Sequence, residues 1–128
     1  MADAGLESRI DALAGRAQVE RESFEPPADP PDEERAMRYL REGVGPALSV
    51  YVEGRSGEWV RFDPDAFARL ERAMNAWLEC YAGCYGVELE ADFTLRTAAE
   101  ALVDTHDIGD VARVLTKVPG RAPDATER

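Results

Sequence analysis

The stretch from Asp63 to Gly86 constrains the fold of this chain more than any other. Its large apolar residues recur every three or four positions, which places them along one side of a helix. They are Phe67, Leu70, Met74, Trp77, Leu78, Tyr81, Cys84 and Tyr85. Asp63 suits the N-cap, Pro64 the first helical position and Gly86 the left-handed stop. We therefore predict a helix over 64–85 that buries one face against the rest of the chain.

Four further segments carry helical patterns of apolar residues. The first covers residues 2–22 and the second begins after Asp32. Thr94 and Asp107 are suitable N-caps for the last two. In the helix after Thr94 the apolar stripe is Leu95, Ala98, Ala99, Leu102 and Val103. The pattern predicts a mainly α-helical fold, a bundle of five to six helices around the 64–85 helix.

One segment in the middle of the chain fits two structures. Alternating apolar residues over 48–52 favour a strand, which could pair with residues 58–62. Val44, Ala47, Leu48 and Tyr51 also continue a helical stripe that begins at Met37, and Pro46 suits the first turn of a new helix after a break. We expect the helix; the alternative is an α+β fold with a β-hairpin at 48–62.

Prolines divide the chain into parts. Residues 24–31, FEPPADPP, hold four prolines, which cannot donate backbone hydrogen bonds, so this segment is predicted to be a linker. It separates an N-terminal amphipathic helix over 1–23 from a helical core domain over 32–119. Residues 120–128 are predicted to form a disordered tail. The N-terminal helix either docks on the core domain or binds elsewhere, and we expect docking.

The charge balance is strongly acidic, with a formal net charge of −11, and of 15 basic residues only Lys117 is lysine. Such a charge destabilises a small domain through self-repulsion unless salt screens it. In molar salt the Debye length falls to about 3 Å, so the repulsion nearly vanishes. We expect a salt-adapted protein. The alternative is a mesophile with a GC-rich genome, because GC-rich codons also favour arginine over lysine.

The expected compartment is the cytoplasm. The first residues lack the charged and apolar regions of a signal peptide, and the longest uncharged runs are far shorter than a membrane span. Two cysteines are too few for a disulfide scaffold, which agrees with a reducing interior. We therefore expect no membrane partner.

Few residues are candidates for metal binding or catalysis. Cys80 and Cys84 stand four apart on one helix and could supply half of a zinc site, with His106 as a further ligand. Packing as small buried side chains is the favoured interpretation. Thr105, His106 and Asp107 lack the nucleophile elbow or phosphate loop that would accompany catalysis. The expectation is a protein without catalytic activity and without cofactors.

Residues 95–118 hold two predicted helices and a tight corner, which also fits a helix-turn-helix DNA-binding regulator. Arg113 and Lys117 would then contact DNA. Asp107 and Asp110, however, place carboxylates where the recognition helix should face phosphates. An αα-hairpin that closes the core is therefore favoured, and nucleic acid is not the expected partner.

The favoured function is that of a cytoplasmic protein-interaction or adaptor domain, which binds an unknown protein or a second copy of itself. Trp59 and Arg61 would face solvent together if Val60 and Phe62 face inward, and such a pair suits a protein contact. The equal alternative is that Trp59 folds over the N-terminus of the 64–85 helix as part of the core. Leu6, Ile10 and Leu13 form the apolar side of the N-terminal helix and are further contact candidates.

Two segments carry a resemblance to known sequences. RFDPDAFARLERAMNAWL and TAAEALVDTHDIGDVARVLTKVP look like parts of small uncharacterised proteins from haloarchaea. The chain thus resembles a family with a domain of unknown function, over residues 32–119. The resemblance implies no activity and assigns no functional residue.

Overall fold

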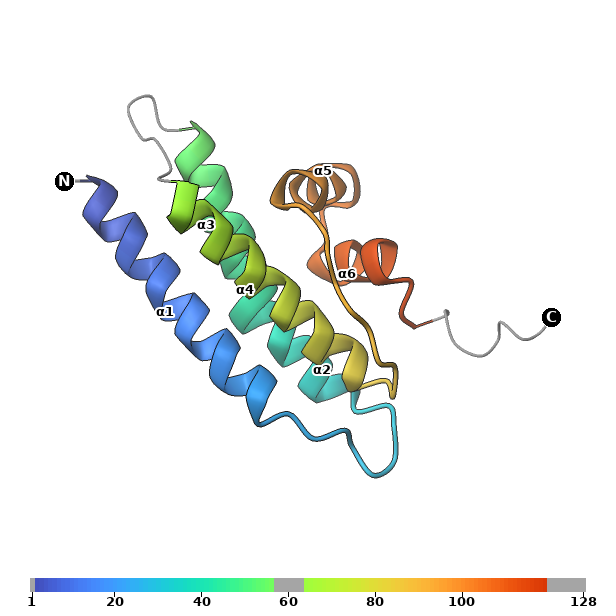
Figure 1. The fold of residues 1–128 in the computed structure, drawn as a ribbon. Helices are drawn as coiled ribbons and strands as arrows, with labels where there is room; N and C mark the ends of the chain where they lie inside the picture. The colour runs from blue at the N-terminus through green and yellow to red at the C-terminus, as the bar shows by residue number, and fades with distance from the viewer. Residues whose placement is uncertain (1, 57–63, 120–128) are drawn as a thin grey trace.

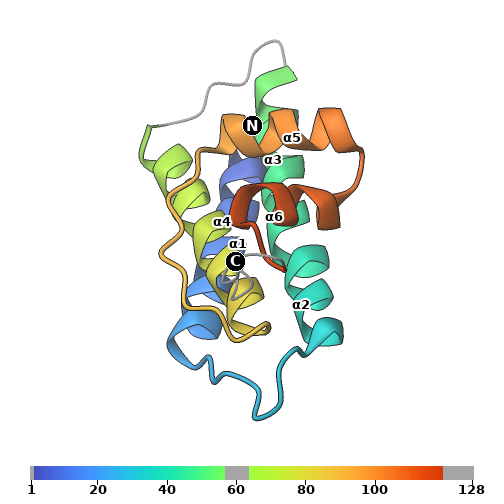
Figure 2. The same cartoon turned by 90° about the vertical axis from the view of Figure 1, so that its right-hand side faces the viewer.

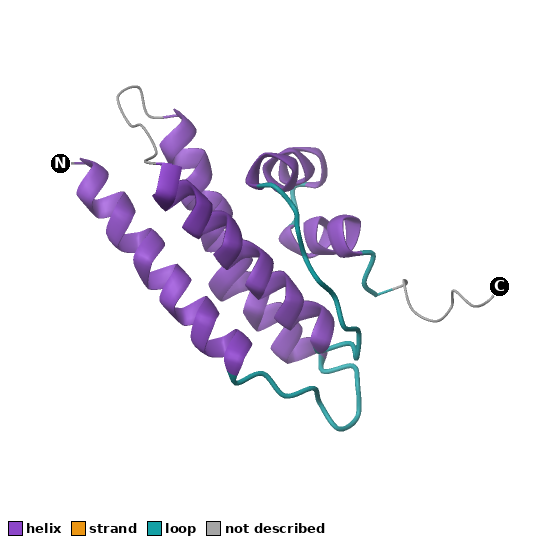
Figure 3. Ribbon diagram, in the orientation of Figure 1, coloured by secondary structure: helices purple, strands orange, loops and turns teal. Residues whose placement is uncertain are grey.

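The structure is a computed structural model that describes residues 2–56 and 64–119, and this part of the chain contains helices and no strand (Figure 3). In chain order the helices are α1 (Ala2–Glu22), α2 (Glu33–Tyr39), α3 (Gly45–Ser56), α4 (Pro64–Gly83), α5 (Leu95–Thr105) and α6 (Ile108–Thr116). A π-helical segment, η1 (Leu40–Val44), joins α2 to α3, so residues 33–56 form one continuous rod. The predicted mainly α-helical bundle is confirmed.

Three long rods lie side by side, and a short helix pair covers one face of them. In Figure 1, α1 runs down, the rod of α2, η1 and α3 runs up, and α4 runs down again. Turned by 90°, the molecule shows α5 and α6 lying across these rods (Figure 2). α4 contacts α1, the second rod and α6, so the predicted central helix has neighbours on several sides.

The β-hairpin alternative is wrong. Residues 45–56 form α3, and of the residues that alternate as in a strand Val52 is exposed. Leu48 and Tyr51, on the predicted helical stripe, are buried. The second predicted strand, at 58–62, lies outside the described residues, as do the predicted N-cap Asp63 and the predicted tail at 120–128.

The second rod also corrects the predicted helix break around Pro46. The chain does not leave the helix there but widens into a π turn, in which the N–H of Gly45 donates to the carbonyl of Leu40. A π turn adds one residue to the helical repeat, which shifts the apolar stripe without interrupting the rod. Leu40 and Val44 both remain fully buried.

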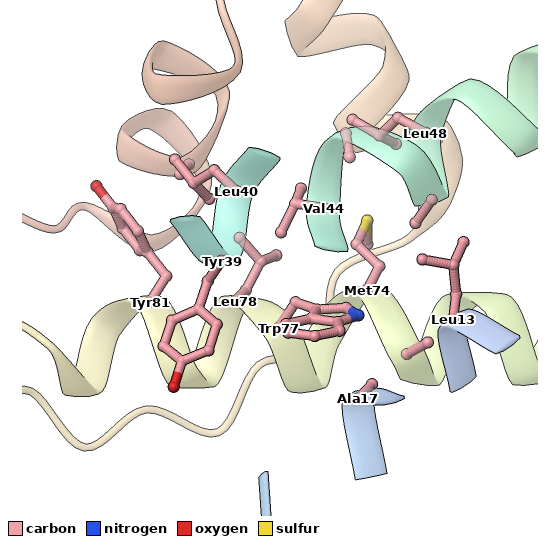
Figure 4. Close-up of a cluster of buried hydrophobic side chains, with 14 of the residues drawn as sticks. Leu13, Ala17, Tyr39, Leu40, Val44, Leu48, Met74, Trp77, Leu78 and Tyr81 are labelled. Atoms are coloured by element: carbon pink, nitrogen blue, oxygen red, sulfur yellow. The ribbon is translucent and has the colours of Figure 1, made fainter. Parts of the chain in front are cut away.

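The core is built around Trp77. Figure 4 shows this side chain between Ala17 of α1 and Val44 of η1. Gly43 packs directly on the indole, because a Cβ added there would lie 2.1 Å from Trp77 Cδ2. The ring of Tyr39 stacks at a tilt, 5.8 Å from Trp77 between centroids. The close approach of η1 to α4 thus depends on a position without a side chain.

Side-chain hydrogen bonds position the connection between α4 and α5. Asn75 donates to the carbonyl of Phe93 at 3.0 Å and accepts from its N–H at 2.9 Å. Glu79 accepts from the N–H of Ala91 at 2.9 Å. These polar residues on α4 bind the extended segment to the bundle, and the segment delivers the chain to the start of α5.

The predicted N-caps start α5 and α6. Thr94 accepts from the N–H of Thr97, and Asp107 accepts from the N–H of Asp110. Between the two helices His106 adopts the left-handed conformation, with φ of 60°. α6 buries Val111, Ala112 and Thr116. The pair is therefore an αα-hairpin that closes the core.

Candidate functional site

Both cysteines are buried thiols. Burial raises the pKa of Cys80 to about 12 and that of Cys84 to about 11. At neutral pH both are protonated, whereas metal binding and nucleophilic attack need the thiolate. His106 lies exposed at the corner between α5 and α6. Within residues 2–56 and 64–119, no three His, Cys, Asp or Glu side chains stand close enough together to hold a metal ion.

His106 has a structural role at its corner. Its backbone N–H donates to the carbonyl of Leu102 at 2.7 Å, which ends α5. The neighbouring Thr105 hydroxyl donates to the carbonyl of Ala101 at 2.8 Å and Asp107 caps α6. Each member of the Thr-His-Asp run therefore serves a helix end.

Two of the predicted contact residues of α1 lie in the core. Ile10 is fully buried and Leu13 nearly so, where α1 packs along α4. A partner would reach these two side chains only if α1 left the bundle. The side chain of Leu6, together with Trp59 and Arg61, lies outside what the structure describes.

Ion pairs that the sequence did not predict tie α1 to the other rods. Their shortest N–O distances are 2.7 Å for Arg9–Glu53, 3.3 Å for Arg16–Glu42, 2.7 Å for Arg21–Glu79 and 2.7 Å for Arg69–Asp11. All four are at least partly exposed, so solvent screens them and each contributes little to stability. Their partners stand 26 to 58 positions apart in the chain, which no local pattern reveals.

The two proposed DNA-contacting residues are placed differently from each other. Arg113 forms an ion pair with Asp110 of its own helix, which neutralises its charge. Lys117 is exposed and ends α6 in the left-handed conformation. The N-terminal turn of α6 carries Asp107 and Asp110, as the sequence indicated. This arrangement repels phosphate at the turn that would have to approach DNA.

Exposed apolar side chains identify a different surface. Four large ones are exposed in the described part of the chain: Val19, Val52, Val103 and Val114. Val52 of α3, exposed to 46%, and Val103 of α5, exposed to 69%, line the same groove. The groove measures about 540 Å³ and is lined by Tyr51, Val52, Arg96, Ala99, Glu100, Val103 and Asp104. We call it the α3–α5 groove.

The exposure of Val103 corrects the predicted stripe of this helix. Leu95 and Ala98 are fully buried, but Ala99 is half-buried and Val103 is turned toward solvent. α5 lies across the rods, so only the part of its stripe that faces them is covered (Figure 2). The sequence shows that the apolar stripe of this helix is wide. It does not show which edge of the stripe the rods leave exposed.

Two other cavities have a different character. One of about 690 Å³ lies between the 24–31 segment and residues 86–90, and it includes Arg21 and Glu79, which pair with each other. One of about 350 Å³ lies between α1 and α4 over a floor of alanines. Neither contains an exposed large apolar side chain, so the α3–α5 groove is the strongest candidate for binding a partner.

The comparisons with known proteins give one family match. No described helix is long and apolar enough to cross a membrane. No curated protein and no solved structure matches the chain. A family model described as Domain of unknown function (DUF8055) matches residues 4–120. This match includes α1 and the 24–31 segment as well as the helices that follow. The chain therefore belongs to the DUF8055 family.

Proposed function

We propose that this chain is a protein-binding domain without catalytic activity, and that its partner docks in the α3–α5 groove. The observation that carries the proposal is the position of Val52 and Val103, which are both exposed and line one concave surface. Apolar side chains gathered in a groove with a charged rim are typical of protein contacts. Arg96, Glu100 and Asp104 supply that rim.

The absence of catalytic activity is proposed from the state of the reactive side chains. Cys80 and Cys84 are held protonated by burial, and His106 ends a helix. A general base or nucleophile needs a partner within hydrogen-bond reach and an activated state. Neither condition is supported at these residues.

The setting we propose is the cytoplasm of a halophilic archaeon. It is supported by the net charge of −11 and by the near absence of lysine, and it agrees with the resemblance of two segments to haloarchaeal sequences. We expect neither a membrane nor nucleic acid as the partner.

A photo-crosslinking amino acid at position 103 tests the docking site in cells of the native host. Position 114 is the matched control, because Val114 is also an exposed valine, at 54%, but lies outside the groove. We expect one defined protein product from position 103 and none from position 114. Equal products from both positions, or none from either, would contradict the proposal.

A further inference from the structure

We infer that the segment docking in the α3–α5 groove is a basic amphipathic helix, which places an aliphatic side chain against Val103 and a lysine or arginine beside Asp104. This inference rests on the proposed function and adds the chemistry of the partner. It follows from the charges on the rim of the groove and from where the acidic ones stand on α5.

The rim contains one carboxylate that the fold leaves unbalanced. Arg96 pairs with Glu100 at 3.3 Å, so these two charges compensate each other. Across the groove, Glu53 next to Val52 is paired with Arg9 at 2.7 Å. Asp104 is exposed and forms no ion pair with any residue in the described ranges. Asp104 is therefore the one charge of this rim that has no opposite charge beside it in the described part of the chain.

The position of Asp104 on its helix adds to its negative potential. It stands in the last turn of α5, which contains no basic residue. The carbonyl groups at a helix C-terminus carry partial negative charge, so a carboxylate there is unfavourable and a cation is favoured. A positively charged side chain from a partner would meet Asp104 and the end of the helix dipole together.

The apolar part of the groove defines the rest of the partner. Ala99 and Val103 stand one turn apart on α5 and face the groove with Val52 of α3. A groove between two helices accepts the apolar face of a third helix, whose side chains recur every three or four residues. Aliphatic and basic residues on neighbouring turns of one helix would reach Val103 and Asp104.

A second copy of this chain fits the rim less well. With a net charge of −11 it would bring further negative charge to a groove that already carries Glu100 and Asp104. A basic side chain of a partner would instead be attracted by Asp104 at contact distance, which is the range that molar salt leaves unscreened. The partner is therefore expected to be a different, basic protein segment.

Three synthetic amphipathic helices test the inference. They share one apolar face of leucine and valine, and their polar positions carry lysine, glutamine or glutamate. Each is titrated into the isotope-labelled full chain at one fixed salt concentration, and amide signals are followed by NMR. We expect the lysine peptide to shift the signals of Ala99, Val103 and Asp104 and to bind most tightly.

Matched variants separate a local contact from general attraction. Asp104→Asn should weaken binding of the lysine peptide by about threefold to fivefold, the range of an exposed ion pair. Asp29→Asn removes the same charge from an exposed residue of the 24–31 segment, at the opposite end of the bundle from α5 (Figure 1), and should leave the affinity nearly unchanged.

The possible failures are distinguishable. If the glutamine peptide binds the groove as tightly as the lysine peptide, the inference is wrong while the docking site stands. If both Asp104→Asn and Asp29→Asn weaken binding equally, the attraction is that of net charge and the inference is also wrong. If no peptide shifts the amide signals of the groove residues, the docking site named in the proposed function is contradicted as well.

Discussion

The contact between Gly43 and Trp77 fixes how closely η1 approaches α4. A methyl group at Gly43 would overlap the indole, with 2.1 Å to Cδ2 and 2.4 Å to Cγ. We expect Gly43→Ala to lower the free energy of unfolding by about 1–3 kcal/mol, since a packed core has no room for the added group. Thermal unfolding followed by circular dichroism measures this.

Gly15→Ala is the matched control for that substitution. Gly15 lies in α1, and a Cβ there would meet nothing within 4 Å. The same chemical change should therefore stabilise the protein by up to about 1 kcal/mol through helix propensity alone. If both variants shift the stability in the same direction, η1 does not pack on Trp77 as described.

The cysteines give a second test at the scale of single residues. Burial raises the pKa of Cys80 from its ordinary value of 9.0 to about 12. We expect iodoacetamide to modify neither Cys80 nor Cys84 at pH 8 in the folded protein, and both in urea. Rapid modification of the folded protein, measured by mass spectrometry, would contradict the burial of the thiols.

The same pKa shifts predict a loss of stability in alkali. Because the folded pKa values of Cys80 and Cys84 are raised, the folded state keeps its protons where the unfolded state has lost them. The contribution of these two thiols to the free energy of unfolding should therefore be constant below about pH 9 and fall as the pH rises from there toward 11 or 12. Replacing both cysteines with alanine should reduce this dependence.

At the scale of elements, the main question is how firmly α1 belongs to the bundle. Ile10→Ala should cost about 2–5 kcal/mol, because Ile10 is fully buried against the rest of the core. Val19→Ala in the same helix should change the stability by less than about 0.5 kcal/mol, since Val19 is 63% exposed. Urea denaturation of both variants measures these changes in the free energy of unfolding. If Ile10→Ala had no effect, α1 would not be part of the folded bundle.

The helices themselves were largely predictable from the sequence, because their signals are local. The periodicity around Trp77 predicted α4, and Thr94 and Asp107 predicted the starts of α5 and α6. The π turn was not predictable. Its Gly43 packs on an indole that follows it by more than thirty positions in the chain, and no local pattern reveals such a contact.

The candidate groove was not predictable for the same reason. Its walls, Val52 on α3 and Val103 on α5, come from distant parts of the chain, and their juxtaposition depends on how α5 crosses the rods. The sequence pattern placed Val103 on the buried stripe. It also marked Ile10 and Leu13 as apolar, but periodicity does not distinguish a helix that docks from one that binds elsewhere.

For the whole molecule, the salt concentration shows how far the net charge affects stability. The net charge of −11 opposes folding at low ionic strength, and screening relieves it. Screening also weakens the four ion pairs of α1, but those are exposed and individually worth little. We expect the midpoint of thermal unfolding to rise between low salt and molar KCl. A midpoint that is unchanged or falls would contradict adaptation to high salt.

The measurement that tests the central claim most directly uses the partner that crosslinking at position 103 identifies. This partner is purified on its own, and its affinity for two serine variants of the chain is measured. Val103→Ser removes an exposed valine from the α3–α5 groove, and Val114→Ser removes one outside it. If the partner docks in this groove, Val103→Ser should weaken binding by about tenfold, as for a residue at the centre of a contact, and Val114→Ser should leave it unchanged. Equal affinities for the two variants would show that the domain binds its partner elsewhere.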